Sequence, residues 1–448
     1  MSALASFLLV GACMAGEDSA GKAELGTGNE TPADGTSGGG GVNINARFQV
    51  KKLTTDDQAF QTADFTDKQL QDVWGVTTLA KEAGSSRAGG TFLDVAQTTG
   101  LLIEVEPNGN PTGTRIMLDK AITGIANNES DRIQLEVKGK CGRASVLVAS
   151  QSGRLWAANP EVSTTTGFVV LDATKVKAQF TGVALIPELG KQGKGDDGGD
   201  DGHGGGQSGC GCDGHGGNDI RQTVLAVDFH NGLVRGYNDQ FQPINLGDRF
   251  QIPDLSNKKE KFSPFGIKKL DDMVVVTAAV RRDPVKGEPQ IDQQVAGNGK
   301  GIVAAFKLDG TLIWSTNQPG HQPQEFDIPW GLEMGGIKLC AKGTALLVSQ
   351  HGLDDRLDGQ GNESGGTIVA LDPTNGDVLG RLMDGKVQGK DQPVRVQGIW
   401  GLTFGANIKG MAQDLLHLGA GPTGRNDGKP PVSHGLFARL DMAQHKDP

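Results

Sequence analysis

The sequence has little of what many common fold and enzyme classes need. Its five cysteines are too few to hold a chain of 448 residues together as a disulfide scaffold. Few stretches carry the i, i+3, i+4 apolar spacing of an amphipathic helix, so we expect little helix. The apolar run at residues 3–12 is too short to span a bilayer.

Signatures of catalysis and of nucleic-acid binding are also missing. The chain contains no H-E-x-x-H pair, no phosphate-binding P-loop and no C-x-x-C-H haem attachment, and G-x-S-x-G occurs only at residues 35–39, in a glycine-rich stretch rather than at a nucleophile elbow. It has 43 basic and 53 acidic residues, a net charge of −10, and no basic patch with interleaved aromatics. We therefore expect no nucleic-acid partner, and contact with a membrane only through a lipid anchor.

What the chain does contain is glycine, 69 residues, much of it between short hydrophobic runs, as many tight turns require. One pattern recurs six times: a bulky or polar residue, then glycine, then leucine, isoleucine or valine. The six glycines are Gly75, Gly124, Gly182, Gly266, Gly331 and Gly401. Six repeats of one unit predict a repeat architecture.

Each repeat continues with further strand-like runs. In the fifth repeat these are residues 345–349, 366–372 and 377–382, and the pair Asn375-Gly376 between the last two is typical of a hairpin turn. Inner strands that are covered on both faces read as continuous apolar runs. The sequence therefore predicts an all-β fold over residues 44–441: a six-bladed β-propeller with four-stranded antiparallel blades. We expect the motif tryptophans to pack as core wedges rather than to form ligand platforms.

The sixth repeat lacks a fourth strand before the chain ends. The strand-like segment 46–53 precedes the first repeat and can supply it. Pairing the first and last segments in one blade would close the ring and remove an open edge. We therefore predict a ring closed by an N-terminal strand.

The motif sequences resemble those of a known group. Residues 329–332 read PWGL, and the phasing of this motif along the chain is similar to that of NHL-repeat propellers. The chain resembles still more an uncharacterised family of exported bacterial six-bladed propeller proteins, from Leu53 to Leu440. The most specific stretches of that resemblance include 225–232 (LAVDFHNG), 263–267 (SPFGI) and 398–405 (GIWGLTFG). That resemblance implies a fold and export, and it implies no established activity.

The N-terminal residues favour export. Residues 1–15 read as a signal peptide, and residues 9–13 (LVGAC) resemble a bacterial lipobox with Cys13 as the lipidated residue, although no lysine or arginine precedes the apolar run. Cleavage after Ala15 is the alternative and would discard Cys13. Residues 16–43 have the composition of a flexible tether, and residues 442–448 form a tail. We expect a bacterial outer-membrane lipoprotein, periplasmic or extracellular.

A glycine- and aspartate-rich insertion occupies residues 187–219, between the first two strands of the third repeat. Its thiols and imidazoles suit Zn²⁺ or Cu, and its carboxylates suit Ca²⁺. The alternative is a solvated acidic loop with a local disulfide between its two cysteines. The candidate ligands are His203, Cys210, Cys212, Asp213 and His215.

Polar residues that follow strands are candidates for a site at the channel mouth, with ordinary turn residues as the alternative. Two functions remain open for the whole propeller. The first is a binding or scaffold module for a protein or glycan partner. The second is a divalent-metal-dependent hydrolase or lyase, lactonase-like, with its site in the central channel. The main candidates are Asp228, His230, His351 and Asp354, with Asp355, His417 and His434 as further ones.

Overall fold

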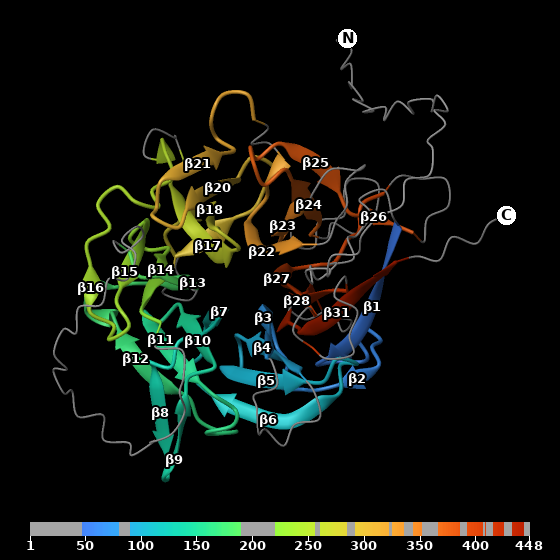
Figure 1. Ribbon diagram of the computed structural model, residues 1–448. Coiled ribbons are helices and arrows are strands. Elements are labelled where there is room, and N and C mark those ends of the chain that lie inside the picture. The colour runs from blue at the N-terminus through green and yellow to red at the C-terminus, as the bar shows by residue number, and fades with distance from the viewer. Residues whose placement is uncertain are drawn as a thin grey trace, which may run out of the picture.

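The computed structural model describes residues 47–79, 90–189, 220–255, 260–284, 292–321, 325–335, 344–351, 366–385, 392–405, 408, 415–424 and 432–442. These residues form six sheets that radiate as blades from a common axis, as the sequence predicts (Figure 1). The colours in Figure 1 run once around the ring, from blue β1 to red β31, which lie side by side.

Each blade contains four antiparallel strands, which follow one another from the axis outward. Blade 1 is β3 (Val73–Leu79), β4 (Thr91–Ala96), β5 (Leu101–Val105) and β6 (Pro111–Met117). Blade 2 is β7 (Ile122–Asn127), β10 (Val146–Ser150), β11 (Arg154–Ala158) and β12 (Phe168–Asp172). Blade 3 is β13 (Phe180–Pro187), β14 (Gln222–Asp228), β15 (Leu233–Tyr237) and β16 (Pro243–Ile244). Blade 4 is β17 (Phe262–Leu270), β18 (Met273–Arg282), β20 (Gly301–Lys307) and β21 (Leu312–Ser315). Blade 5 is β22 (Pro329–Gly335), β23 (Ala345–Gln350), β24 (Ile368–Leu371) and β25 (Val378–Arg381).

Blade 6 joins the two ends of the propeller. It is built from β27 (Ile399–Phe404), β28 (Leu416–Ala420), β31 (Leu436–Met442) and β1 (Arg47–Thr55). β1 runs antiparallel to β31, from the pair Phe48–Met442 to the pair Thr55–Leu436. The predicted closure by an N-terminal strand is confirmed, because β1 supplies the strand that the sixth repeat lacks.

Apolar side chains fill the space between every two neighbouring blades. β18 shows why its sequence is a continuous apolar run. Val274 and Val276 pack toward blade 3, whereas Val275 between them packs toward blade 5. Successive side chains of a strand point to opposite faces, and here both faces are covered. A strand that is covered on both faces therefore carries a continuous apolar run, as β18 does at Val274–Val276.

The repeated glycine motif lies where the inner strands come closest to the axis. In every blade the pairing of the inner strand with its neighbour shifts register at the motif, as a β-bulge does. A Cβ on Gly75 would stand 2.8 Å from the carbonyl oxygen of Thr123 in blade 2, and one on Gly401 would stand 2.8 Å from the amide nitrogen of Val76 in blade 1. None of the six glycines has a φ between +20° and +160°. The motif requires glycine because a side chain would not fit, and the backbone conformation itself does not require it.

The described residues hold a few elements besides the blades. A hairpin of β8 (Gln134–Val137) and β9 (Lys140–Arg143) projects from blade 2, and a short 3-10 helix covers Thr174–Val176. β2 (Phe65–Thr66) and β26 (Met383–Asp384) pair with β1, β19 (Gln293–Val295) pairs with β18, and β29 (Thr423–Gly424) pairs with β30 (Val432–Ser433). No helix among these residues is long and apolar enough to cross a membrane.

Candidate functional site

A cluster of aromatic side chains fills the centre of the ring. Trp74 and Trp400 stack with their ring centroids 4.1 Å apart and an interplanar angle of 20°. The rings of Trp330 and Phe265 pack against Trp74 in a T-shaped arrangement, with centroid distances of 5.9 and 6.0 Å. All four residues precede a motif glycine, and the register shift at that point directs their side chains to the axis. The tryptophans are core wedges, as the sequence analysis expects, because each is buried. We call these four residues and Phe229 the aromatic plug.

Hydrogen bonds across the axis hold one side of the plug. The indole Nε1 of Trp330 donates to the carbonyl oxygen of Thr181 at 3.1 Å. Thr181, which stands where blades 1, 4, 5 and 6 have an aromatic residue, donates through Oγ1 to the carbonyl oxygen of Phe265 at 2.5 Å. The indole N–H groups of Trp74 and Trp400 have no acceptor among the described residues. Buried donors of this kind are normally satisfied by protein, water or ligand.

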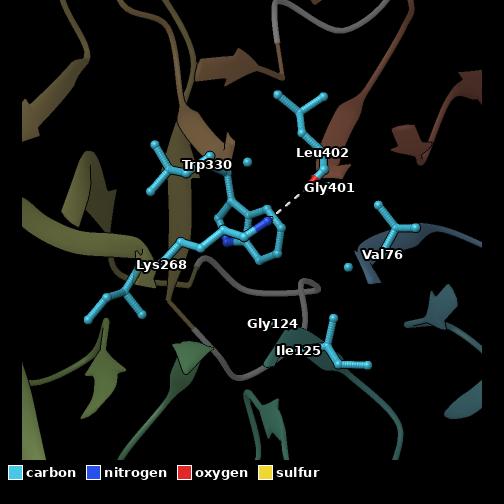
Figure 2. Close-up of a pocket in the computed structure, with 11 residues that line it drawn as sticks. Val76, Gly124, Ile125, Lys268, Trp330, Gly401 and Leu402 are labelled. Carbon is cyan, nitrogen blue, oxygen red and sulfur yellow. Dashed lines mark hydrogen bonds between the residues drawn. The ribbon is translucent and has the colours of Figure 1, made fainter. Parts of the chain in front are cut away.

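A lysine closes the channel on the side of the plug toward which the inner strands run. The ammonium of Lys268 donates to Glu333 Oε2 at 2.9 Å and to the carbonyl oxygen of Leu402 at 3.2 Å. Figure 2 shows its side chain reaching past Trp330 toward Leu402. The cavity left there is about 30 Å³, room for little more than a water molecule.

A larger cavity, which we call the mouth pocket, opens on the other side of the plug. Its volume is about 440 Å³. It lies at the face where the inner strands begin, because Asp72 and Ala121 directly precede β3 and β7. Trp74 and Trp400 of the plug line it. Four other lining residues directly follow the second strand of their blade: Gln97, Gln151, His351 and Gly421. The remaining lining residues are Thr98, Lys120, Gln293, Gln294 and Ser433.

The glutamines of this pocket are the residues that the sequence analysis missed. Gln97 follows β4 and Gln151 follows β10, the same place that His351 occupies after β23. The backbone N–H of Gln97 donates to the carbonyl oxygen of Asp72 at 3.0 Å, and that of Gln151 donates to the carbonyl oxygen of Ala121 at 2.9 Å. Each acceptor directly precedes the inner strand of the same blade. The sequence contained this signal, because residues at equivalent positions of different blades reach the same face of a propeller.

Asp228 lies on the same face but serves its own blade. It is fully buried at the end of β14. Its carboxylate accepts hydrogen bonds from Arg235 Nε at 2.7 Å, from Asn231 Nδ2 at 2.8 Å and from the backbone N–H of Gln179 at 3.1 Å. These bonds fix the turn between β14 and β15, and the residue does not line the mouth pocket.

His230 belongs to a network between blades 3 and 4. Its Nδ1 donates to Asp292 Oδ2 at 2.9 Å, and Arg281 Nη1 donates to the same oxygen at 2.6 Å. The side-chain amide of Gln179 clamps the backbone of Asp292, donating to its C=O and accepting from its N–H, both at 2.9 Å. The imidazole is therefore oriented by a buried carboxylate, while 39% of the side chain stays exposed.

The other predicted site residues are separate from this network. His351 is buried at the mouth pocket, and its ring lies 4.1 Å from the ring of Trp400. His434 lies between the Phe60 ring, at 4.0 Å, and the carboxylate of Asp56, at 3.2 Å, where it ties the end of β1 to blade 6. Asp354, Asp355, the loop candidates His203, Cys210, Cys212, Asp213 and His215, and Cys13 lie outside the described residues. Their proposed roles stay predictions.

Two buried titratable groups lie in blades 6 and 1. His417, on β28, packs 4.3 Å from the ring of Phe92 and 5.6 Å from that of Phe437. Burial, with a smaller effect of the charge on Arg439, lowers the pKa of His417 to about 3, so the imidazole is neutral. Asp94, on β4, is fully buried, and neither carboxyl oxygen has a hydrogen-bond partner among the described residues. Burial, and then the charge of Asp67, hold the pKa of Asp94 well above its usual range.

The geometry defines the class of protein. The chain is a six-bladed β-propeller with a closed axis and a polar pocket at one mouth. Within the described ranges, no three His, Cys, Asp or Glu side chains gather closely enough to hold a metal ion.

Comparison with known proteins adds little beyond the fold. No known family model matches the sequence. An uncharacterized protein of Acanthamoeba polyphaga mimivirus is 25% identical over 223 residues, which are 48% of this chain and 35% of that relative. The match therefore spans only about a third of the relative's length.

Solved structures with a related shape are distant. A chain of the COPII outer coat vertex on membranes has a TM-score of 0.40 and 9% identity, covering 84% of this chain and 86% of that one. A chain of the hydrazine synthase of Kuenenia stuttgartiensis has a TM-score of 0.34 and 9% identity, covering 78% and 77%. TM-scores of this size carry no functional information.

Proposed function

We propose that this protein is a binding module whose ligand occupies the mouth pocket. The observation that carries the proposal is the composition of the pocket wall. It draws side chains from blades 1, 2, 4, 5 and 6, and the aromatic plug closes its base. Loops held by a rigid scaffold are the usual place for binding residues. The volume of about 440 Å³ lies in the range of sites for small molecules.

The alternative, a divalent-metal-dependent hydrolase or lyase with its site in the channel, has less support. The plug occupies the channel, and Asp228 and His230 are engaged in two different networks. A site for that chemistry would need these groups to converge on one point. The oriented His230 imidazole is the feature that speaks most for catalysis, but it does not line the mouth pocket.

The proposal is tested by filling the pocket. Thr98→Trp, in the exposed turn between β4 and β5, places a large side chain in the pocket. Lys175→Trp, in the exposed 3-10 helix, is the matched control. We expect small polar molecules screened by ligand-observed NMR to bind the wild type and the control, and to lose binding to Thr98→Trp. A set of ligands that bind all three proteins equally would refute the proposal.

Export is a separate proposal that depends on residues 1–43. We propose that the chain is exported and lipidated at Cys13, which would hold the propeller at a bacterial envelope by the tether 16–43. The supporting features are the short apolar run and the LVGAC sequence that ends it. Mass spectrometry of the N-terminal peptide, after expression of the full chain in a bacterial host, should show an acylated cysteine that Cys13→Ser abolishes. An unmodified Cys13 in the mature protein would contradict it.

A further inference from the structure

The ligand of the mouth pocket can be narrowed by the chemistry of its wall. One cation, Lys120, and one anion, Asp72, line the pocket, so its formal charge is balanced. No arginine is among the described residues that line it. Sites for carboxylates or phosphates normally supply a surplus of positive charge, often as bidentate arginine. The pocket therefore favours a ligand without net charge.

The remaining polar groups are four primary amides and two hydroxyls. A primary amide offers two N–H donors and an acceptor oxygen, whereas a hydroxyl group is a donor and an acceptor at once. Adjacent amides can therefore satisfy adjacent hydroxyl groups in both directions. A ligand that carries many hydroxyl groups matches this wall better than one that carries only acceptors. These groups belong to Gln97, Gln151, Gln293, Gln294, Thr98 and Ser433.

Gln97 and Gln151 show that the wall is organised in advance. Gln97 Nε2 donates to Gln151 Oε1 at 3.3 Å, from blade 1 to blade 2. This bond holds both side chains and leaves the oxygen of Gln97 and the Nε2 group of Gln151 for other partners. Only 6% of Gln151 is exposed, and its Nε2 group has no acceptor among the described residues. This Nε2 group can donate to a ligand oxygen in the pocket.

The base of the pocket differs from its wall. Trp74 and Trp400 are core wedges that are only 3% and 2% exposed, and the small exposed part of each ring gives the base an apolar character. Their indole nitrogens are buried away from the pocket, so these rings offer it only apolar atoms. Sugars combine an apolar C–H face with a rim of hydroxyl groups, and such a ligand would meet both parts of this site.

We propose that the mouth pocket binds an uncharged carbohydrate of about one or two sugar rings, the size that its volume admits. This inference rests on the proposed binding function and names the ligand class for the same site. The ring hydroxyls bond to the Gln97–Gln151 pair, and the apolar face of the sugar lies toward Trp74 and Trp400.

The test uses the full chain and a panel of defined probes. The neutral probes are the mono- and disaccharides of glucose, galactose, mannose, xylose and N-acetylglucosamine, and the charged probes are glucuronate, glucose 6-phosphate and inorganic phosphate. Saturation-transfer NMR identifies binders, and calorimetry measures their Kd. Gln151→Leu removes the donor at similar size, and Gln134→Leu, on the exposed β8, is the control.

We expect at least one neutral probe to bind with a stoichiometry of one, and to bind about tenfold more weakly to Gln151→Leu than to the control. Its Kd should change less than about twofold between about 50 mM and about 500 mM NaCl, because no charge is paired. Melting temperatures of the variants, matched to the wild type, show that the fold is intact.

The outcomes separate this inference from the proposed function. Binding of charged probes alone, blocked by Thr98→Trp, would overturn the carbohydrate assignment and leave the binding site standing. Binding of a neutral probe with the same Kd to Gln151→Leu and to the control would also overturn the assignment. If no probe of either kind binds in a way that Thr98→Trp prevents, both proposals fall.

Discussion

The carbonyl oxygen of Trp400 occupies the space that a Cβ atom on Gly331 would need. The two residues belong to blades 5 and 6, and the same relationship links each motif glycine to the next blade around the ring. A Cβ on Gly124 would stand 2.7 Å from Gly182, and one on Gly266 would stand 2.5 Å from the carbonyl oxygen of Trp330. The axis of the propeller is thus a closed chain of backbone contacts, each of which depends on a missing side chain.

Gly331→Ala should therefore destabilise the protein strongly, by about 3 kcal/mol or more, because the backbone of blade 6 has to move. Gly182→Ala is the matched comparison. Its Cβ would stand 3.1 Å from Ile267, so we expect a cost of about 1 kcal/mol. Urea denaturation measures both. Equal stabilities of the two variants would contradict the close-approach explanation.

Removal of the closing strand should weaken the whole ring. Deletion of residues 1–55 exposes the edge of β31 and removes Leu53, which packs with Val73 and Phe92 of blade 1. We expect the melting temperature to fall by about 10 °C or more. A chain that begins at residue 44 keeps β1, and its melting temperature should equal that of the wild type. An unchanged melting temperature after the longer deletion would mean that β1 does not close the ring.

The buried carboxyl of Asp94 should make the protein less stable as the pH rises. The pKa of Asp94 is raised by burial, so above pH 3.8 the unfolded state loses the proton first and the stabilising contribution of the protonated form declines. It is fully present below pH 3.8 and is lost as the pH rises through the raised pKa. Asp94→Asn removes the titratable carboxyl and therefore removes this loss of stability with rising pH. We expect its advantage over the wild type to grow with pH, by about 1.4 kcal/mol per pH unit, until the native pKa is reached. Denaturation between pH 4 and pH 9 measures the difference, and a constant difference would refute it.

The buried imidazole of His417 should make the protein less stable as the pH falls. Its pKa is about 3 in the folded protein and 6.5 when unfolded, so the unfolded state binds the proton first as the pH falls. The stability contributed by the neutral imidazole is complete above pH 6.5 and is lost between pH 6.5 and pH 3. His417→Phe keeps an aromatic ring beside Phe92 and Phe437. Relative to the wild type, the variant should gain about 1.4 kcal/mol per pH unit below pH 6.5. Parallel acid-unfolding curves for the two proteins would show that His417 is not the group involved.

The sequence predicted the propeller because its repeats carry local signals. The six glycine motifs mark the inner strands, and Asn375-Gly376 forms a turn with Gly376 at a φ of 79°. The missing fourth strand of the last repeat pointed to β1. The reason for the motif glycines was not predicted, since their role depends on the distance to the next blade, which no single repeat contains.

The candidate site was much harder to predict, because its contacts join different blades. His230 and Asp292 are 62 residues apart, and Gln97 and Gln151 are 54 apart. Such pairs meet only when each loop takes its angular place around the axis. A histidine after a strand attracts notice as a catalytic type of residue, whereas a glutamine in the same position does not. Comparison of equivalent positions across repeats, rather than of residue types, would have found the pocket wall.

The pairing of β1 with β31 also constrains how the protein is made. On a ribosome the first strand emerges early and waits, with one edge open, until residues near 442 have been synthesised. Blades 1 to 5 can form in order as they leave the exit tunnel, but blade 6 cannot be completed before then. A permuted chain that begins at β3 and carries β1 after β31 would place both halves of that blade together at the end of translation, and it should be less prone to pair with a second nascent copy.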